Sequence, residues 1–86
     1  MADYQITFVR SARKELEVLD AEIVGRIFRK IEFLAGEPCP ASCLKLVGEN
    51  NLWRIRIGDY RVIYSIDDKK KNVDIAAVRH RREAYD

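Results

Sequence analysis

The feature that most constrains this chain is a pair of alternating segments, residues 53–57 and 60–64, separated only by Gly58 and Asp59. A two-residue connection between such segments is typical of a β-hairpin, and glycine at its first position suits a type II′ turn. So short a turn fixes the register of the two strands. The predicted pairs are Ile57 with Tyr60, Arg56 with Arg61, Ile55 with Val62, Arg54 with Ile63, and Trp53 with Tyr64.

The two faces of this hairpin differ in chemistry. One face carries the side chains suited to packing: Trp53, Ile55, Ile57, Tyr60, Val62 and Tyr64. The other places Arg56 directly opposite Arg61, with Arg54 on the diagonal. Like charges opposite each other destabilise a ladder by up to about 1 kcal/mol, and the planar donor fork of arginine suits phosphate. We interpret this face as a polyanion site; a face of solvated arginines is the alternative.

The rest of the chain predicts two helices and further strands. Residues 4–9, 44–46, 52–57, 60–66 and 72–78 have strand patterns. Ser11 is expected to cap a short helix, and Asp20 a longer one that stops at Gly36. The longer helix has an apolar stripe of Ile23, Val24, Ile27, Phe28, Ile31, Leu34 and Ala35. Its basic residues Arg26, Arg29 and Lys30 are expected to form a solvated face.

This order of elements predicts an α+β fold. An N-terminal strand and a helical hairpin precede an antiparallel β-meander, and the helices pack on one face of a twisted antiparallel sheet. The 86 residues suffice for a single domain, residues 1–86. A chain with 48% hydrophobic and 35% charged residues is too apolar for intrinsic disorder and too charged for a membrane span.

Net charge, the N-terminal sequence and the cysteines indicate the cellular compartment and limit the metal sites that the chain can form. The net charge is only +2, but the basic excess lies in the second half of the chain. The N-terminus has no signal-peptide pattern, so we expect a cytoplasmic protein without a membrane partner. Cys39 and Cys43 are expected to be free thiols. With His80 as the only histidine, they cannot complete a zinc tetrad within one chain.

The C-terminal segment adds a second basic cluster. It contains Arg79, His80, Arg81, Arg82 and Tyr85. A helical turn after the last strand would place Arg81 and Tyr85 on one side. The ordinary pKa of histidine, near 6.5, suits His80 to proton transfer, although an exposed bystander is the alternative. Basic groups beside an aromatic ring that can stack on a base are typical of RNA sites.

The chain lacks the usual equipment of metal-dependent or nucleophilic catalysis. It has no acidic cluster placed for Mg²⁺, no glycine-rich phosphate loop, and no convincing Ser-His-Asp or Cys-His arrangement. We therefore expect no metal and no cofactor. RNA supplies its own nucleophile, the 2′-hydroxyl, so an enzyme need only align it, stabilise the added negative charge and move protons.

Two motifs carry a family resemblance: W-R-I-R-x-G-x-Y-R-V-x-Y at residues 53–64 and H-R-R-x-x-Y at residues 80–85. With the opening strand, the helix pair and Lys45-Leu46, they resemble the RelE/ParE superfamily of bacterial and archaeal toxins, in its RelE-like branch. The resemblance implies a toxin of a type II toxin–antitoxin system. Its activity would be ribosome-dependent, metal-independent mRNA cleavage that halts translation until an antitoxin binds.

The resemblance also implies roles for single residues. It places Arg54, Arg56 and Arg61 on an RNA-facing sheet, Arg81 near the scissile phosphate and Tyr85 against the base or nucleophile. The candidate catalytic residues are Arg61, His80, Arg81 and Tyr85, and the candidate RNA-binding residues are Lys45, Arg54, Arg56, Arg79 and Arg82. The implied partners are the ribosome, mRNA and an acidic antitoxin in a hetero-oligomer.

Two other functions remain open. A ParE-like toxin would inhibit DNA gyrase by binding it, without cleaving RNA, and a noncatalytic member would only bind RNA through its arginines. An assay of mRNA cleavage on translating ribosomes separates the three hypotheses.

Overall fold

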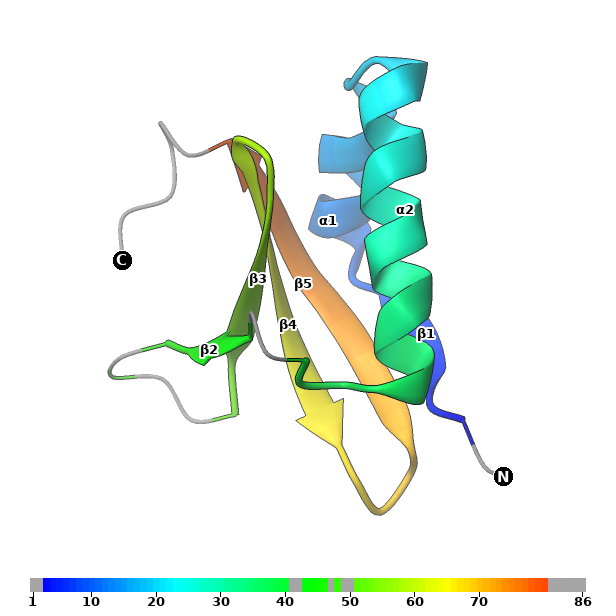
Figure 1. Cartoon of the computed structure of the whole chain (residues 1–86), viewed down its shortest axis with the longest axis vertical. Helices are drawn as coiled ribbons and strands as arrows, with labels where there is room; N and C mark the ends of the chain where they lie inside the picture. The colour runs from blue at the N-terminus through cyan, green and yellow to red at the C-terminus, as the bar shows by residue number, and fades with distance from the viewer. Residues whose placement is uncertain (1–2, 41–42, 47, 49–50, 81–86) are drawn as a thin grey trace.

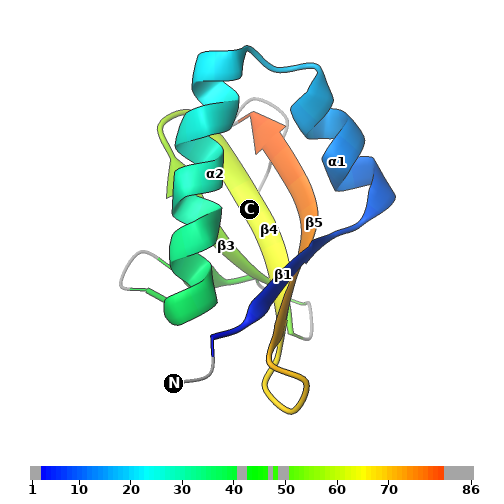
Figure 2. The same ribbon diagram turned by 90° about the vertical axis from the view of Figure 1, so that its right-hand side faces the viewer.

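The fold is a five-stranded sheet with a helical hairpin on one face (Figures 1 and 2). The structure, a computed structural model, describes residues 3–40, 43–46, 48 and 51–80. The elements in chain order are β1 (Gln5–Phe8), α1 (Arg10–Glu17), α2 (Ala21–Gly36), β2 (Leu44–Lys45), β3 (Trp53–Ile57), β4 (Tyr60–Asp67) and β5 (Asn72–His80). The sheet order is β1-β5-β4-β3-β2. The predicted α+β class and the predicted placement of the helices are confirmed.

The sheet is mixed, which corrects the prediction of a wholly antiparallel one. Strands β2 to β5 form the expected antiparallel meander, whereas β1 lies parallel to β5, with Gln5 opposite Asn72 and Phe8 opposite Ile75. The helical hairpin carries the chain from one edge of the sheet to the other, and the meander then returns beside β1. Side-chain alternation has period two for either strand direction, so the sequence pattern did not reveal this orientation.

The first helix begins earlier than expected. Ser11 lies inside α1 and does not cap it; the capping position belongs to Val9. The backbone explains this start, because the Val9 N–H donates to the Ile75 carbonyl while the Val9 carbonyl accepts from Arg13. Helix α2 does begin after Asp20, as predicted, but through the Asp20 carbonyl, which accepts from Val24, and without a side-chain cap.

The core lies between the helices and the predicted apolar face of the hairpin. Its fully buried members come from both helices and from strands β4 and β5: Ala12, Ile27, Ile31 and Leu34 from the helices, and Val62, Tyr64, Val73 and Ile75 from the sheet. Ile55 and Ile57 are buried as well. One member of the predicted stripe on α2 differs, since Phe28 remains 38% exposed.

A disulfide joins Cys39 and Cys43, so the prediction of free thiols was wrong. The loop after α2 turns back on itself through a hydrogen bond from the Cys43 N–H to the Pro40 carbonyl. This turn brings the two Cα atoms to 5.1 Å, within the range that a disulfide requires. The cysteines therefore give no support to a reducing compartment.

We expect two glycine substitutions to have opposite effects. Gly58 has a φ of +59°, which L-residues adopt at a cost of about 1–2 kcal/mol, so Gly58→Ala should lower the free energy of unfolding by about that amount. Gly25 lies within α2, and in the described part of the chain no atom outside its own helical turns is within 4 Å of where its Cβ would stand. Gly25→Ala should raise the free energy of unfolding by about 0.5–1 kcal/mol. Urea denaturation measures both, and a stabilising Gly58→Ala would contradict the turn assignment.

The buried Tyr64 should make the fold sensitive to high pH. Its hydroxyl donates to the Pro38 carbonyl at 2.7 Å, and burial raises the pKa of Tyr64 to about 12, from an ordinary value of 10. The folded protein therefore favours the protonated phenol of Tyr64. The stabilisation that this difference in pKa gives the folded protein is complete below pH 10, and it is lost as the pH rises from 10 to 12.

A Tyr64→Phe variant tests this sensitivity. At neutral pH it should lose about 1 kcal/mol, because the Pro38 carbonyl loses its donor. Above pH 10 its free energy of unfolding should fall less steeply than that of the parent chain. Equal alkaline slopes for the two proteins would contradict the assignment.

Candidate nucleic-acid interface

The hairpin of β3 and β4 has the register that the sequence predicts at all five positions. The pairs in the structure are Trp53 with Tyr64, Arg54 with Ile63, Ile55 with Val62, Arg56 with Arg61, and Ile57 with Tyr60. The turn has a positive φ at Gly58 and none at Asp59, as a type II′ turn requires. The two predicted faces of the hairpin are therefore confirmed.

Three arginines lie on the face of the sheet that is turned away from the helices. We call Arg54, Arg56 and Arg61 the arginine face. Together with Leu44 from β2 they line a hollow, the arginine hollow. Arg56 is exposed, and Arg54 and Arg61 are half-buried. None of the described residues that line this hollow is acidic, so its chemistry favours an anionic ligand with several charges.

Lys45 does not join the arginine face. It lies opposite Trp53 in the ladder of β2 and β3, so its side chain leaves the other side of the sheet. Its ammonium lies 5.7 Å from the centre of the Trp53 ring, within the range of a cation–π contact. Leu44, which the sequence analysis did not select, takes its place at the arginine hollow because it lies opposite Arg54.

Arg79 lies beside the arginine face, on a third strand, and pairs with Glu15. It lies opposite Arg61 in the ladder of β4 and β5. Its Nε donates to Oε2 of Glu15 at 2.7 Å, and Oε1 of the same carboxylate accepts the Val78 N–H at 2.8 Å. Glu15 therefore ties α1 to the end of β5 and balances the charge of Arg79.

The structure separates His80 from the arginine face. His80 lies opposite Tyr60 in the ladder, and the two rings meet edge to face with their centroids 5.1 Å apart. Because Tyr60 shares its side of the hairpin with Ile57, His80 lies on the helix side of the sheet, whereas Arg61 lies on the other. Arg81, Arg82 and Tyr85 lie outside the described residues.

The sequence analysis missed Glu15 and the surroundings of one basic cluster. Glu15 gave no local signal, because its partners lie more than sixty residues away along the chain. Arg26, Arg29 and Lys30 are exposed, as the predicted solvated face requires, and with Arg56 they line a groove between α2 and β3. Their spacing placed them on one side of the helix, but only the packing of α2 showed which strand lies beside them.

Two further features were searched for among the described residues. These residues contain no cluster of three or more histidine, cysteine, aspartate or glutamate side chains that could hold a metal ion. Within the same ranges, no helix has the length and apolar character needed to cross a membrane.

Solved structures of RelE toxins have this fold. The RelE–RelB complex from Pyrococcus horikoshii OT3 contains a chain that is 32% identical, with a TM-score of 0.82 over 95% of this chain and 99% of that chain. A chain of the RelBE2 complex from Mycobacterium tuberculosis is 30% identical, with a TM-score of 0.81 over 91% and 98%. A chain of the Escherichia coli RelBE complex is 26% identical, with a TM-score of 0.77 over 87% and 93%. No curated protein matches the chain.

These likenesses define a RelE-like toxin fold of the RelE/ParE superfamily, which confirms the resemblance seen in the sequence. The chain belongs to the family described as the ParE toxin of the type II toxin–antitoxin system parDE, whose model matches residues 6–85. It is a toxin of a type II toxin–antitoxin system.

Removing the Glu15 carboxylate should loosen α1 from β5. Glu15→Ala deletes the acceptor of the Val78 N–H and the partner of Arg79, so it should lower the free energy of unfolding by about 1–3 kcal/mol. Glu17→Ala is the matched control, since Glu17 is exposed on the same helix, and it should change stability by less than about 0.5 kcal/mol. Equal stabilities for the two variants in urea denaturation would show that the Glu15 contacts contribute nothing.

Proposed function

We propose that the protein is a ribosome-dependent, metal-independent mRNA endonuclease. The observation that carries this proposal is the arginine hollow, where Arg56 lies directly opposite Arg61 with Arg54 beside them. Three guanidiniums on one face of the sheet suit the phosphates of an RNA strand. The likeness to RelE toxins over nearly the whole chain supports the same function.

In the proposed reaction the 2′-hydroxyl of one nucleotide attacks the adjacent phosphorus. A bond forms between the 2′-oxygen and phosphorus while the bond from phosphorus to the 5′-oxygen breaks. A base takes the proton of the 2′-hydroxyl, and an acid supplies one to the leaving 5′-oxygen. The products are a 2′,3′-cyclic phosphate and a 5′-hydroxyl, and no metal or co-reactant is needed.

The chain's own residues divide these tasks. Arg61 and Arg81 are proposed to stabilise the charge that develops on the phosphate, since arginine keeps its proton. Arg54 and Arg56 hold the strand, and Arg82 adds positive charge near it. Arg79, whose charge Glu15 balances, is assigned a hydrogen-bonding contact with the RNA. Lys45, on the other side of β2, is assigned to RNA outside the hollow. Tyr85 is proposed to transfer a proton or position the base.

The proposed inhibitor is an acidic antitoxin. The similar RelE chains were solved in complexes with RelB, and the arginine face offers an acidic segment a complementary surface. Such complementarity raises the rate of encounter more than the affinity. In the proposed hetero-oligomer the antitoxin covers the arginines and thereby blocks RNA.

One observation favours a second candidate function. The family that matches residues 6–85 is a ParE family, and ParE-like toxins are expected to inhibit gyrase without cleaving RNA. Assays of mRNA cleavage on translating ribosomes and of DNA supercoiling by gyrase, run on the same protein, distinguish the two activities.

The arginine face should control cleavage and leave folding nearly unchanged. Arg61→Ala should reduce single-turnover cleavage on translating ribosomes by roughly 10²–10³-fold, the usual cost of one charge-stabilising donor. The free energy of unfolding should change by less than about 0.5 kcal/mol. Arg10→Ala, an exposed arginine on α1, is the control and should leave both quantities unchanged. Retained cleavage together with a large loss of stability would make Arg61 a structural residue.

The proton-transferring group can be assigned by three variants. His80 packs against Tyr60 on the opposite side of the sheet from Arg61, so His80→Gln should reduce cleavage by less than about tenfold. If Tyr85 transfers a proton, Tyr85→Phe should cost roughly 10²–10⁴-fold. A harmful Tyr85→Ala with a nearly silent Tyr85→Phe would assign Tyr85 to stacking. If His80→Gln instead reduces cleavage by roughly 10²–10⁴-fold, His80 is the residue that transfers the proton.

A further inference from the structure

A second basic surface lies on α2, outside the arginine face. Arg26, Arg29 and Lys30 follow one another at i, i+3 and i+4, so they lie on one side of the helix. All three are exposed. With Arg56, Ile57 and Gly58 they line a groove between α2 and the end of β3, which we call the α2 groove.

The α2 groove adjoins the arginine hollow. Arg56 lines both, so a ligand that leaves the hollow past Arg56 enters the groove. Among the residues that the structure describes, β2 pairs with Trp53 and Arg54, and no strand pairs with the next three residues of β3 on that side. An extended ligand can therefore pass around this edge without crossing a described strand.

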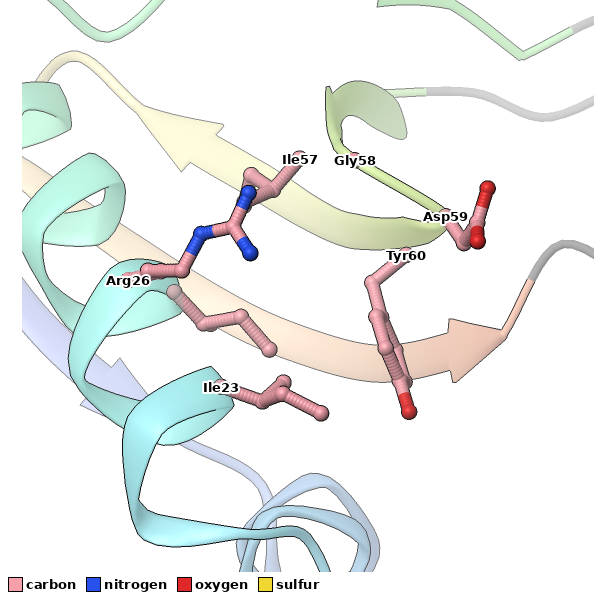
Figure 3. A pocket seen from close by; sticks show the side chains of 7 residues that line it. Ile23, Arg26, Ile57, Gly58, Asp59 and Tyr60 are labelled. Carbon is pink, nitrogen blue, oxygen red and sulfur yellow. The ribbon is translucent and has the colours of Figure 1, made fainter.

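Figure 3 shows a pocket that shares Arg26, Ile57 and Gly58 with the α2 groove. The Arg26 side chain extends from α2 toward Ile57 and Gly58, while the Asp59 carboxylate points away from it. A Cβ at residue 58 would lie 3.7 Å from a terminal nitrogen of Arg26, which shows how closely the guanidinium approaches the turn. The other residues that line this pocket are Ile23, Ile27, Asp59 and Tyr60, so Asp59 is an acidic member of the pocket but not of the groove.

The lining of the groove selects the chemistry of the ligand. It contains four cationic side chains and one apolar side chain, and none of its described members is acidic. Protein interfaces are enriched in aromatic residues, methionine and arginine; this groove has arginines, but neither an aromatic residue nor a methionine is among its described members. A backbone that carries one negative charge per residue of the polymer matches a row of cations better, and single strands bind in such positively charged grooves.

We propose that the α2 groove binds the phosphate backbone of the RNA strand that flanks the segment held on the arginine face. Arg26, Arg29 and Lys30 contact the flanking phosphates, and Arg56 lies at the junction of the two segments. This inference rests on the proposed function for the identity of the ligand. It replaces the interpretation of these three residues as a solvated face.

The test compares two triple variants of the full chain. The groove variant is Arg26→Gln/Arg29→Gln/Lys30→Gln. The control is Arg10→Gln/Arg13→Gln/Lys14→Gln, which removes the same charge from exposed positions of α1. Fluorescence anisotropy measures the affinity for single-stranded RNAs of about 4 and about 16 nucleotides, a range that covers known single-strand site sizes, over a series of salt concentrations.

The groove variant should bind the long RNA more weakly and the short RNA as the parent chain does. For the long RNA, the slope of log K against log salt should become shallower by roughly 2, since each lost phosphate contact removes about 0.7. The control variant should keep the slope of the parent chain. Equal losses in both variants would show a general charge effect and overturn the proposal.

Two further outcomes distinguish the groove from the proposed function. If the groove variant shows the expected losses while the parent chain cleaves no mRNA on ribosomes, the groove is supported and the nuclease function fails. If it binds both RNAs normally but fails to bind an acidic antitoxin, the groove is a protein-binding surface and the proposal is overturned.

Discussion

A two-residue turn allows the β3–β4 hairpin a single register, and the sorting of side chains in this molecule depends on that register. A shift by one residue would move every side chain of the hairpin to the opposite face. Ile55, Val62 and Tyr64 would then leave the core, and the arginines would enter it. The positive φ of Gly58 is therefore needed both for the core beneath the helices and for the charged surface opposite.

The charged surface is tolerated because the core does not depend on it. In the described part of the chain, both helices lie on the side of the sheet away from the arginine face (Figure 1), and the core cluster lies on their side. Arg79, beside the arginine face, is balanced by Glu15 of α1. The same carboxylate accepts a backbone N–H of β5, so the one contact both positions the first helix and reduces the repulsion between Arg79 and the arginine face.

The sequence predicted what short-range rules determine and missed what distant contacts determine. The register of 53–64, the two faces of the hairpin and the start of α2 after Asp20 follow from alternation, helical spacing and turn chemistry, and the structure agrees with them. The parallel direction of β1, the role of Glu15 and the position of α2 beside Arg56 depend on the path of the chain in space. None of these three has a local pattern, since each joins segments whose proximity is set only by packing. The disulfide between Cys39 and Cys43 is a different case: it is local, but its C-x3-C spacing does not distinguish a disulfide from two free thiols.

The pairing of β1 with β5 affects how the toxin forms during synthesis. Thr7 and Asp74, which hydrogen-bond across this pair, are 67 positions apart in the chain. Contacts between such distant positions slow folding, and a ribosome adds only about 5–20 residues per second. A nascent chain that ends before β5 lacks the strand that pairs with β1. It also lacks Val78 and Arg79, which donate hydrogen bonds to Glu15. The ribosome that makes this protein therefore releases most of the chain before the folded toxin can exist beside it.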